Sequence, residues 1–167
     1  MRKVEMSTSR GYRDQLDRAR RFLERVRGAI YVEDDPCEIS DVEYQDTVWA
    51  FFQNCWHIKD WVKHDSAVPE QTRQRVIEAA ESSAVLYICQ DMANGTKHLK
   101  LTRPQAGAGA RHGHMSTTIV QGLLVKFDCV IVLADGSERS AREVACECME
   151  EWVKILERED LATARLS

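Results

Sequence analysis

The stretch DVEYQDTVWAFFQNCWHIKDWVKHD, residues 41–65, decides the fold. Its large apolar side chains cover most of the circumference of a helix, which is typical of a helix buried among others. Ser40, followed three residues later by Glu43, forms a capping box, so we expect the helix to begin there. The stretch therefore predicts the central helix of a bundle. Its large apolar residues are Val48, Trp49, Phe51, Phe52, Trp56, Ile58, Trp61 and Val62.

Helices are also expected on both sides of this stretch. Upstream, apolar residues at spacings of three and four predict a helix that starts at caps in residues 7–9 and ends near Gly28. Downstream, Pro69 suits the first turn of a helix, and a further helix is expected over residues 82–98, with or without a break near residues 82–83. Residues 7–98 are therefore predicted to form the helical bundle.

The pattern changes after residue 98. Residues 103–115 are rich in Gly and Ala, which predicts a flexible loop; its His112 and His114 belong either to a lid over a site or to an ordinary loop. Residues 116–134 are rich in β-branched residues that alternate with others, which predicts strands, and residues 139–158 return to helical spacing. We expect one mainly α domain over residues 1–167, a helical bundle with a small C-terminal antiparallel β element (α+β).

Composition narrows the class of protein. The chain is 44% hydrophobic and 30% charged, as in globular proteins, and no apolar run is long enough to span a membrane. The start of the sequence has no apolar segment typical of a secretory signal, so we expect a cytoplasmic protein. The six cysteines are then reduced thiols. Cys55 and Cys89 are expected in the core, and Cys146 and Cys148 lack a zinc-knuckle spacing.

Charge is unevenly distributed although the net charge is only −4. Residues 2–27 carry nine Arg and Lys against four acids, whereas residues 33–46 carry seven acids and no base. Two interpretations fit. The two segments can be solvated faces that attract one another, or the basic first helix can contact the phosphates of RNA or DNA.

Two polar stripes are the candidate functional feature. In each stripe three polar residues follow the spacing i, i+3, i+7, so they share one face of a helix. Apolar neighbours suggest that both stripes face inward or line a cleft. If the two helices pack antiparallel, the stripes are expected to meet. The first stripe is His57, Asp60 and His64, and the second is Asp91, Asn94 and His98.

Three hypotheses account for the stripes. The first is a buried hydrogen-bonded network in a non-enzymatic interaction protein. The second is a divalent metal site for zinc, iron or manganese, because histidine and carboxylate side chains at helical spacing bind metals in bundles. The third is RNA chemistry. The candidate metal ligands are His57, Asp60, His64, Asp91 and His98.

Residues 91–98, DMANGTKH, resemble the signature of the HEPN superfamily, in which an Arg, often followed by Asn, precedes a His near the end of a helix. Asn94 and His98 match that signature, whereas Ala93 stands in place of the Arg. The resemblance implies a helical bundle that binds or cleaves RNA without a metal, often in toxin–antitoxin or phage-defence systems, at a cleft between two subunits. A homodimer would suit it.

The resemblance also implies roles for residues. His98 would act as general acid or base and Asn94 would orient the phosphate. Lys97 or an N-terminal arginine would supply the missing positive charge. His57 and Asp60, from the first stripe, complete the set of candidate catalytic residues.

Overall fold

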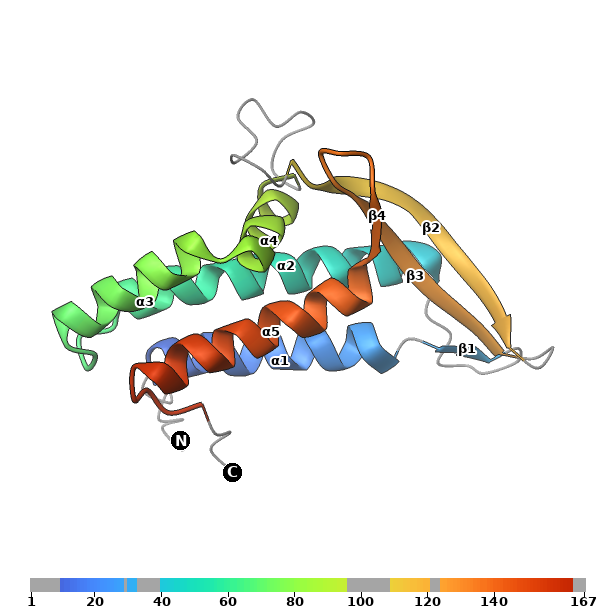
Figure 1. Cartoon of the computed structure of the whole chain (residues 1–167). Helices are drawn as coiled ribbons and strands as arrows, with labels where there is room; N and C mark the ends of the chain where they lie inside the picture. The colour runs from blue at the N-terminus through green and yellow to red at the C-terminus, as the bar shows by residue number, and fades with distance from the viewer. Residues whose placement is uncertain (1–9, 29, 33–39, 96–108, 121–123, 164–167) are drawn as a thin grey trace, which may run out of the picture.

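The computed structural model describes residues 10–28, 30–32, 40–95, 109–120 and 124–163. Over these residues the chain forms helices that lie side by side, with a small antiparallel sheet at one end (Figure 1). This is the mainly α architecture that the sequence predicts. The helices are α1 (Tyr12–Gly28), α2 (Asp41–His64), α3 (Glu70–Ser82), α4 (Ala84–Gly95) and α5 (Ala141–Arg158). The strands are β1 (Ile30–Val32), β2 (Arg111–Val120), β3 (Leu124–Val132) and β4 (Glu138–Ser140).

The helix α2 begins at the predicted capping box. Ser40 Oγ accepts a hydrogen bond from the backbone N–H of Glu43 at 3.2 Å, and the Glu43 carboxylate accepts one from the backbone N–H of Ser40 at 2.9 Å. Residues of α2 contact α1, α3, α4 and α5. The prediction of a central helix is therefore confirmed, and Phe51, Phe52 and Ile58 are fully buried within it.

The helices α3 and α4 are separated at the predicted break. Ser83 has an extended backbone (φ −82°, ψ 121°), which ends α3. The structure describes α4 as far as Gly95, and the predicted continuation of this helix to residue 98 lies outside the described residues. A Cβ at Gly95 would meet no described atom within 4 Å. Within the described part of the chain, no segment comes close enough to Gly95 to require a glycine there.

The sheet is built around β3. β2 pairs along one edge of β3, while β1 and β4 pair with opposite ends of its other edge. Three details differ from the prediction. β2 begins at Arg111, so the last residues of the predicted loop 103–115 are strand; β1 lies at residues 30–32 and β4 at residues 138–140, beyond the predicted 116–134.

A bulge explains why the start of β2 was not predicted. The register shifts between His112 and Met115, which breaks the alternation that identifies a strand. Gly113 lies inside this bulge, and a Cβ there would come within 2.9 Å of the Val130 carbonyl oxygen. In the sequence, Gly113 is typical of a loop. In the structure it is needed because β3 comes too close for any side chain at this position.

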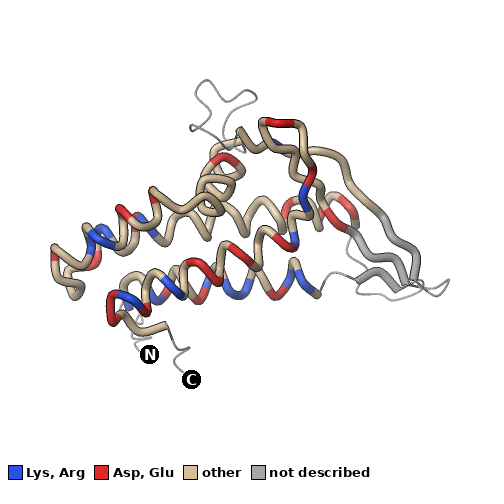
Figure 2. The backbone as a smooth tube through the Cα atoms, in the orientation of Figure 1, with Lys and Arg blue, Asp and Glu red and all other residues tan. Residues whose placement is uncertain are grey.

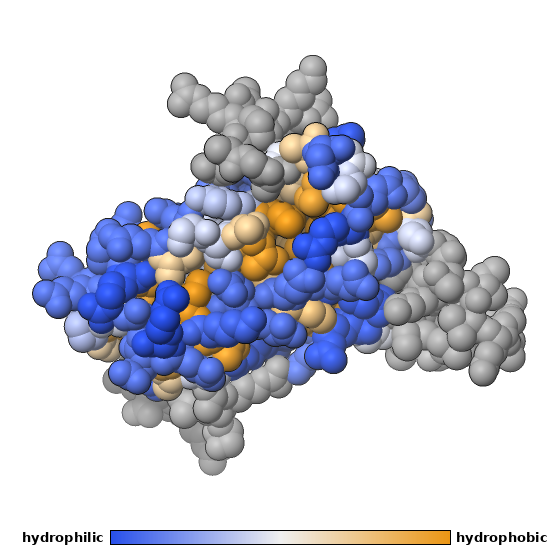
Figure 3. All heavy atoms as spheres, in the orientation of Figure 1, coloured by the Kyte–Doolittle hydropathy of each residue, from blue (hydrophilic) through white to orange (hydrophobic). Residues whose placement is uncertain are grey.

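The core lies between the helices and reaches the sheet. α5 follows the predicted range 139–158 closely and buries Trp152 completely. The face seen in Figure 3 is mostly hydrophilic, with an apolar band between α4 and α5 where core residues approach the surface. None of the helices in the described part of the chain is long and apolar enough to cross a membrane.

Cys55 and Cys89 are core residues, as predicted. Cys55, Cys89 and Cys148 are completely buried, and Cys146, two residues before Cys148, is half-buried on another side of α5. The Cys89 thiol donates to the Phe52 carbonyl at 3.5 Å. Burial raises the pKa of the Cys89 and Cys148 thiols, so both are protonated at neutral pH.

Candidate functional site

The first polar stripe lies on the outside of α2. His57 is half-buried, and Asp60 and His64 are exposed. Asp60 and His64 line a hollow of about 380 Å³ beside Trp61 and the start of α1, and His64 also borders a larger hollow of about 670 Å³ near residues 160–162. Of the two expectations for this stripe, an inward face is wrong for Asp60 and His64, whereas the alternative of residues that line a cleft fits both.

The second stripe is divided between the core and the end of α4. Asp91 is only 1% exposed, and its Oδ2 accepts a hydrogen bond from the backbone N–H of Ala110 at 3.1 Å. Asn94 is half-buried on the last described turn of α4, whereas Ala93 is buried in the core. His98, the central residue of the HEPN-like signature, lies outside the described residues.

The register of α2 and α4 keeps the described parts of the two stripes apart. Cys89 of α4 lies beside Phe52 of α2, and Glu81, on the last turn of α3, forms an ion pair with Lys59 at 2.9 Å. Asp91 is buried against Ala110, whereas Asp60 and His64 line a hollow beside Gly11 and Asp65 near the C-terminal end of α2. The expectation that the two stripes meet is therefore wrong for Asp91 with Asp60 and His64, while a meeting that involves His98 lies outside the described residues.

The metal hypothesis receives no support from the described ligands. Within the described ranges, no three His, Cys, Asp or Glu side chains come close enough together to hold a metal ion. His57, Asp60, His64 and Asp91 therefore do not form a site by themselves. A zinc, iron or manganese site that includes His98 stays a prediction.

A different group of side chains comes together on α1 and α2. Arg18, Arg21 and Arg25 follow the spacing i, i+3, i+7 on α1, so they share a face, and all three are exposed. No carboxylate of the described residues lies within ion-pair distance of these three guanidinium groups. We call these three side chains, with the rings of Phe22 and Trp61, the arginine face.

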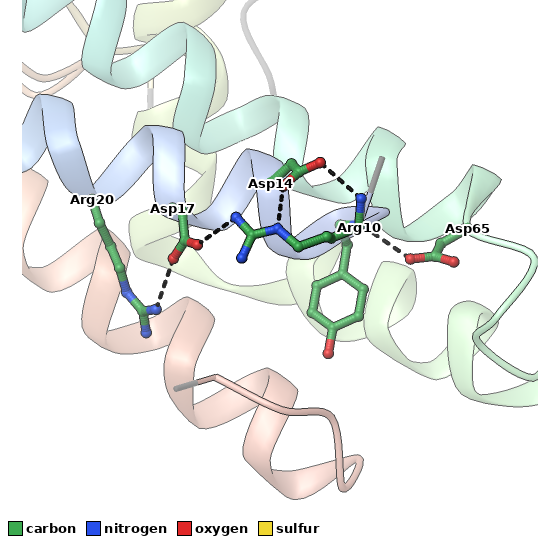
Figure 4. A network of polar contacts seen from close by, with 6 residues as sticks. Arg10, Asp14, Asp17, Arg20 and Asp65 are labelled. Atoms are coloured by element: carbon green, nitrogen blue, oxygen red, sulfur yellow. Dashed lines mark hydrogen bonds and ion pairs between the residues drawn. The ribbon is translucent and has the colours of Figure 1, made fainter. Parts of the chain in front are cut away.

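The aspartates of α1 do not neutralise the arginine face because other arginines bind them. Asp14 accepts a hydrogen bond from Arg10 Nε at 2.8 Å, and Asp17 pairs with Arg10 at 3.3 Å and with Arg20 at 3.5 Å (Figure 4). Along α1, basic residues outnumber acidic ones. Figure 2 marks the basic residues blue and the acidic residues red along the backbone. The positive charge of the arginine face is therefore available to a ligand.

Aromatic rings support two of the three arginines. The guanidinium of Arg18 lies 5.6 Å from the centre of the Trp61 ring, and that of Arg25 lies 5.2 Å from the centre of the Phe22 ring. Arg18 also donates to Gln15 Oε1 at 2.8 Å. Cation–π contacts and this hydrogen bond restrict the side chains before any ligand arrives, which lowers the entropy cost of binding.

Asp65 sets the position of α1 against α2. Its Oδ2 accepts from the backbone N–H of Tyr12 at 3.0 Å, and its Oδ1 accepts from the backbone N–H of Ala67 at 2.9 Å. Gly11 has a φ of +63°, and a Cβ there would lie 1.8 Å from Asp65 Oδ2, so only glycine lets the carboxylate come this close. The arrangement brings Trp61 beside Arg18. His57, one turn before Trp61, follows the same edge of α2.

His112 pairs with Trp49 near the sheet. Trp49 Nε1 donates to His112 Nδ1 at 2.7 Å, and the two rings meet edge to face with 4.9 Å between their centres. Because Nδ1 accepts this bond, the proton of the neutral ring is on Nε2. Burial lowers the pKa of His112 to about 4. His112 is therefore a neutral structural residue at physiological pH, and the interpretation of residues 111–115 as part of a loop or lid is wrong.

We expect His112 to make stability depend on pH. In the unfolded chain its pKa returns to about 6.5, so the folded state binds fewer protons between the two values. Stability is complete above pH 6.5 and falls as the pH drops toward 4, by about 2 kcal/mol after allowance for partial solvent screening. Urea unfolding of wild type and His112→Gln across this range measures the effect. An equally steep loss in both proteins would contradict the assignment.

Spacing alone could have identified the arginine face. Arg18, Arg21 and Arg25 follow the same i, i+3, i+7 spacing as the two stripes, whereas the total excess of basic residues in the helix does not show which of them share a face. The ring of Phe22 is half-buried and contacts the guanidinium of Arg25, so this apolar residue also belongs to the arginine face. The pairing of Arg18 with Trp61 joins different helices, and no local pattern predicts it.

Comparisons with protein-family models, with curated proteins and with solved structures found no match. The resemblance to the HEPN superfamily therefore stays a prediction from residues 91–98, and the function is argued from the arginine face.

Proposed function

We propose that the protein binds single-stranded RNA through the arginine face. The observation that carries the proposal is the row of three exposed arginines, Arg18, Arg21 and Arg25, with no carboxylate partner among the described residues and with aromatic rings beside them. Guanidinium groups bind phosphates by charge-assisted hydrogen bonds. Aromatic rings and guanidinium planes stack on the unpaired bases of single strands, which duplexes do not expose.

The dimensions of the arginine face fit a short segment of RNA. From Arg18 to Arg25 the helix rises about 10 Å, which is the length of roughly three stacked nucleotides. His57 borders the same edge and adds a ring that can donate and accept hydrogen bonds. A contact of this size predicts modest affinity that is dominated by phosphate contacts rather than by sequence.

The proposal concerns binding and does not depend on the HEPN-like signature. RNA cleavage by His98 and Asn94, with His57 and Asp60, stays a prediction, as does the homodimer that would complete a HEPN cleft. Ala93, at the position of the signature arginine, is 2% exposed and packs in the core. A positive charge for catalysis would therefore have to come from another residue.

Removal of the three charges is expected to weaken RNA binding by about 20-fold, because three phosphate contacts are lost together. Fluorescence anisotropy with a short labelled RNA that lacks secondary structure compares wild type with the Arg18→Gln, Arg21→Gln, Arg25→Gln triple variant. These side chains are exposed, so circular dichroism should show an unchanged fold.

A matched control removes the same charge from other surfaces. Arg75, Arg139 and Arg158 lie on α3, β4 and α5, and each pairs with a glutamate. Their triple replacement by Gln should leave the Kd within about twofold, since paired charges far from the arginine face make no phosphate contact. An equal rise in the Kd for RNA in both triple variants would mean that binding depends only on the net charge of the protein, which would contradict the proposal.

A further inference from the structure

A pocket of about 490 Å³ lies between α1 and α5, on a different side of α1 from the arginine face. Its volume falls within the range of small-molecule sites in proteins. The apolar side chains that line it come from both helices and include a half-buried thiol. They are Leu23 of α1 and Cys146, Met149 and Val153 of α5.

The rim of this pocket is positive. Arg20 and Arg27 from α1 and Lys154 from α5 line it, against one acid, Glu150. No ion pair of Arg27 or Lys154 is present among the described residues. The rim therefore carries two cations whose charge is not balanced by a partner.

Arg20 adds a third cation to the same pocket. Its side chain is 16% exposed, and its Nη1 lies 3.5 Å from Asp17 Oδ1. That nitrogen is buried and makes no hydrogen bond to any described atom. The guanidinium of Arg20 is therefore held at the pocket by an ion pair without a hydrogen bond, and it adds positive charge beside Arg27 and Lys154.

We infer that this pocket binds a small anionic amphiphile, a carboxylate with an apolar body such as a medium-chain fatty acid. The apolar part lies against Leu23, Met149 and Val153, while the carboxylate lies at the rim near Arg20, Arg27 and Lys154. A neutral amphiphile of the same length gains only the apolar contacts, and a free phosphate gains only the charged ones. Binding here is independent of RNA binding because Arg18, Arg21 and Arg25 lie on another side of α1.

The thiol of Cys146 reports occupancy of the pocket. The sixth cysteine, Cys37, lies outside the described residues and is replaced by serine. In this background iodoacetamide should modify Cys146 first, because Cys55, Cys89, Cys129 and Cys148 are buried. Decanoate is expected to slow this alkylation about tenfold at saturation, whereas decanol should protect only at concentrations about tenfold higher. Mass spectrometry of the alkylated peptide gives the rate at each concentration.

Two variants test whether decanoate binding depends on the charged residues of the pocket or only on its apolar lining. The Arg27→Gln, Lys154→Gln double variant should raise the half-protecting concentration of decanoate about tenfold and leave that of decanol unchanged. The control, an Arg18→Gln, Arg21→Gln double variant, removes the same charge. Its half-protecting concentration of decanoate should equal that of wild type. No protection by decanoate, equal protection by decanol, or an unchanged double variant would overturn the inference. RNA affinity of the Arg27→Gln, Lys154→Gln variant should stay at the wild-type value, so each proposal can fail separately.

Discussion

The affinity of the protein for single-stranded RNA is expected to fall about 20-fold between about 50 and 200 mM salt. Three arginines that each displace a counterion from a single strand give a slope of about −2 in a plot of log K against log salt concentration. Anisotropy titrations at four or more salt concentrations measure this slope. The effect follows from Arg18, Arg21 and Arg25 being exposed and unpaired with carboxylates of the described residues.

The slope should change in the variants in a defined way. The Arg18→Gln, Arg21→Gln, Arg25→Gln variant should lose most of the salt dependence, while the control at Arg75, Arg139 and Arg158 should keep it. A wild-type slope that survives the first triple substitution would place the phosphate contacts on another surface. The arginine face would then have no role in RNA binding.

Asp91→Ala is expected to lower the free energy of unfolding by about 2–3 kcal/mol. The Asp91 carboxylate is 1% exposed and accepts a hydrogen bond from the backbone N–H of Ala110, which joins α4 to the residue before β2. Its loss leaves a buried donor without an acceptor and a small cavity. Urea or thermal unfolding measures the change.

Asp60→Ala provides the matched comparison for Asp91→Ala. The two aspartates belong to stripes with the same spacing in the sequence. In the structure Asp91 is buried, whereas Asp60 is exposed. Its replacement should change stability by less than about 0.5 kcal/mol. Equal destabilisation by the two substitutions would show that Asp60 also has a buried partner, contrary to the structure.

Local patterns were sufficient to predict the helices. The Ser40–Glu43 capping box gives the start of α2, and the apolar circumference of residues 41–64 gives its central position. These signals act within a few residues, so they survive in the final fold. The sheet is harder to predict because the bulge at Gly113 and the three-residue strands β1 and β4 depend on contacts with β3.

The candidate site depends on what helical spacing cannot specify. Spacing gives the face on which His57, Asp60 and His64 lie, but not how far α2 is displaced along its axis against α4. That displacement is set by packing, as the contact of Cys89 with Phe52 shows, and it separates residues that the pattern would join. The pairing of Arg18 with Trp61 cannot be predicted from spacing for the same reason, since it depends on how α1 packs against α2.

Photo-crosslinking of a 4-thiouridine RNA to the wild-type protein, with mass spectrometry of the crosslinked peptides, tests the central claim most directly. The account predicts crosslinks in the peptide that contains Phe22 and in the peptide that contains Trp61, and their loss in the Arg18→Gln, Arg21→Gln, Arg25→Gln variant. Crosslinks that fall on α5 or the sheet and persist in that variant would contradict RNA binding at the arginine face.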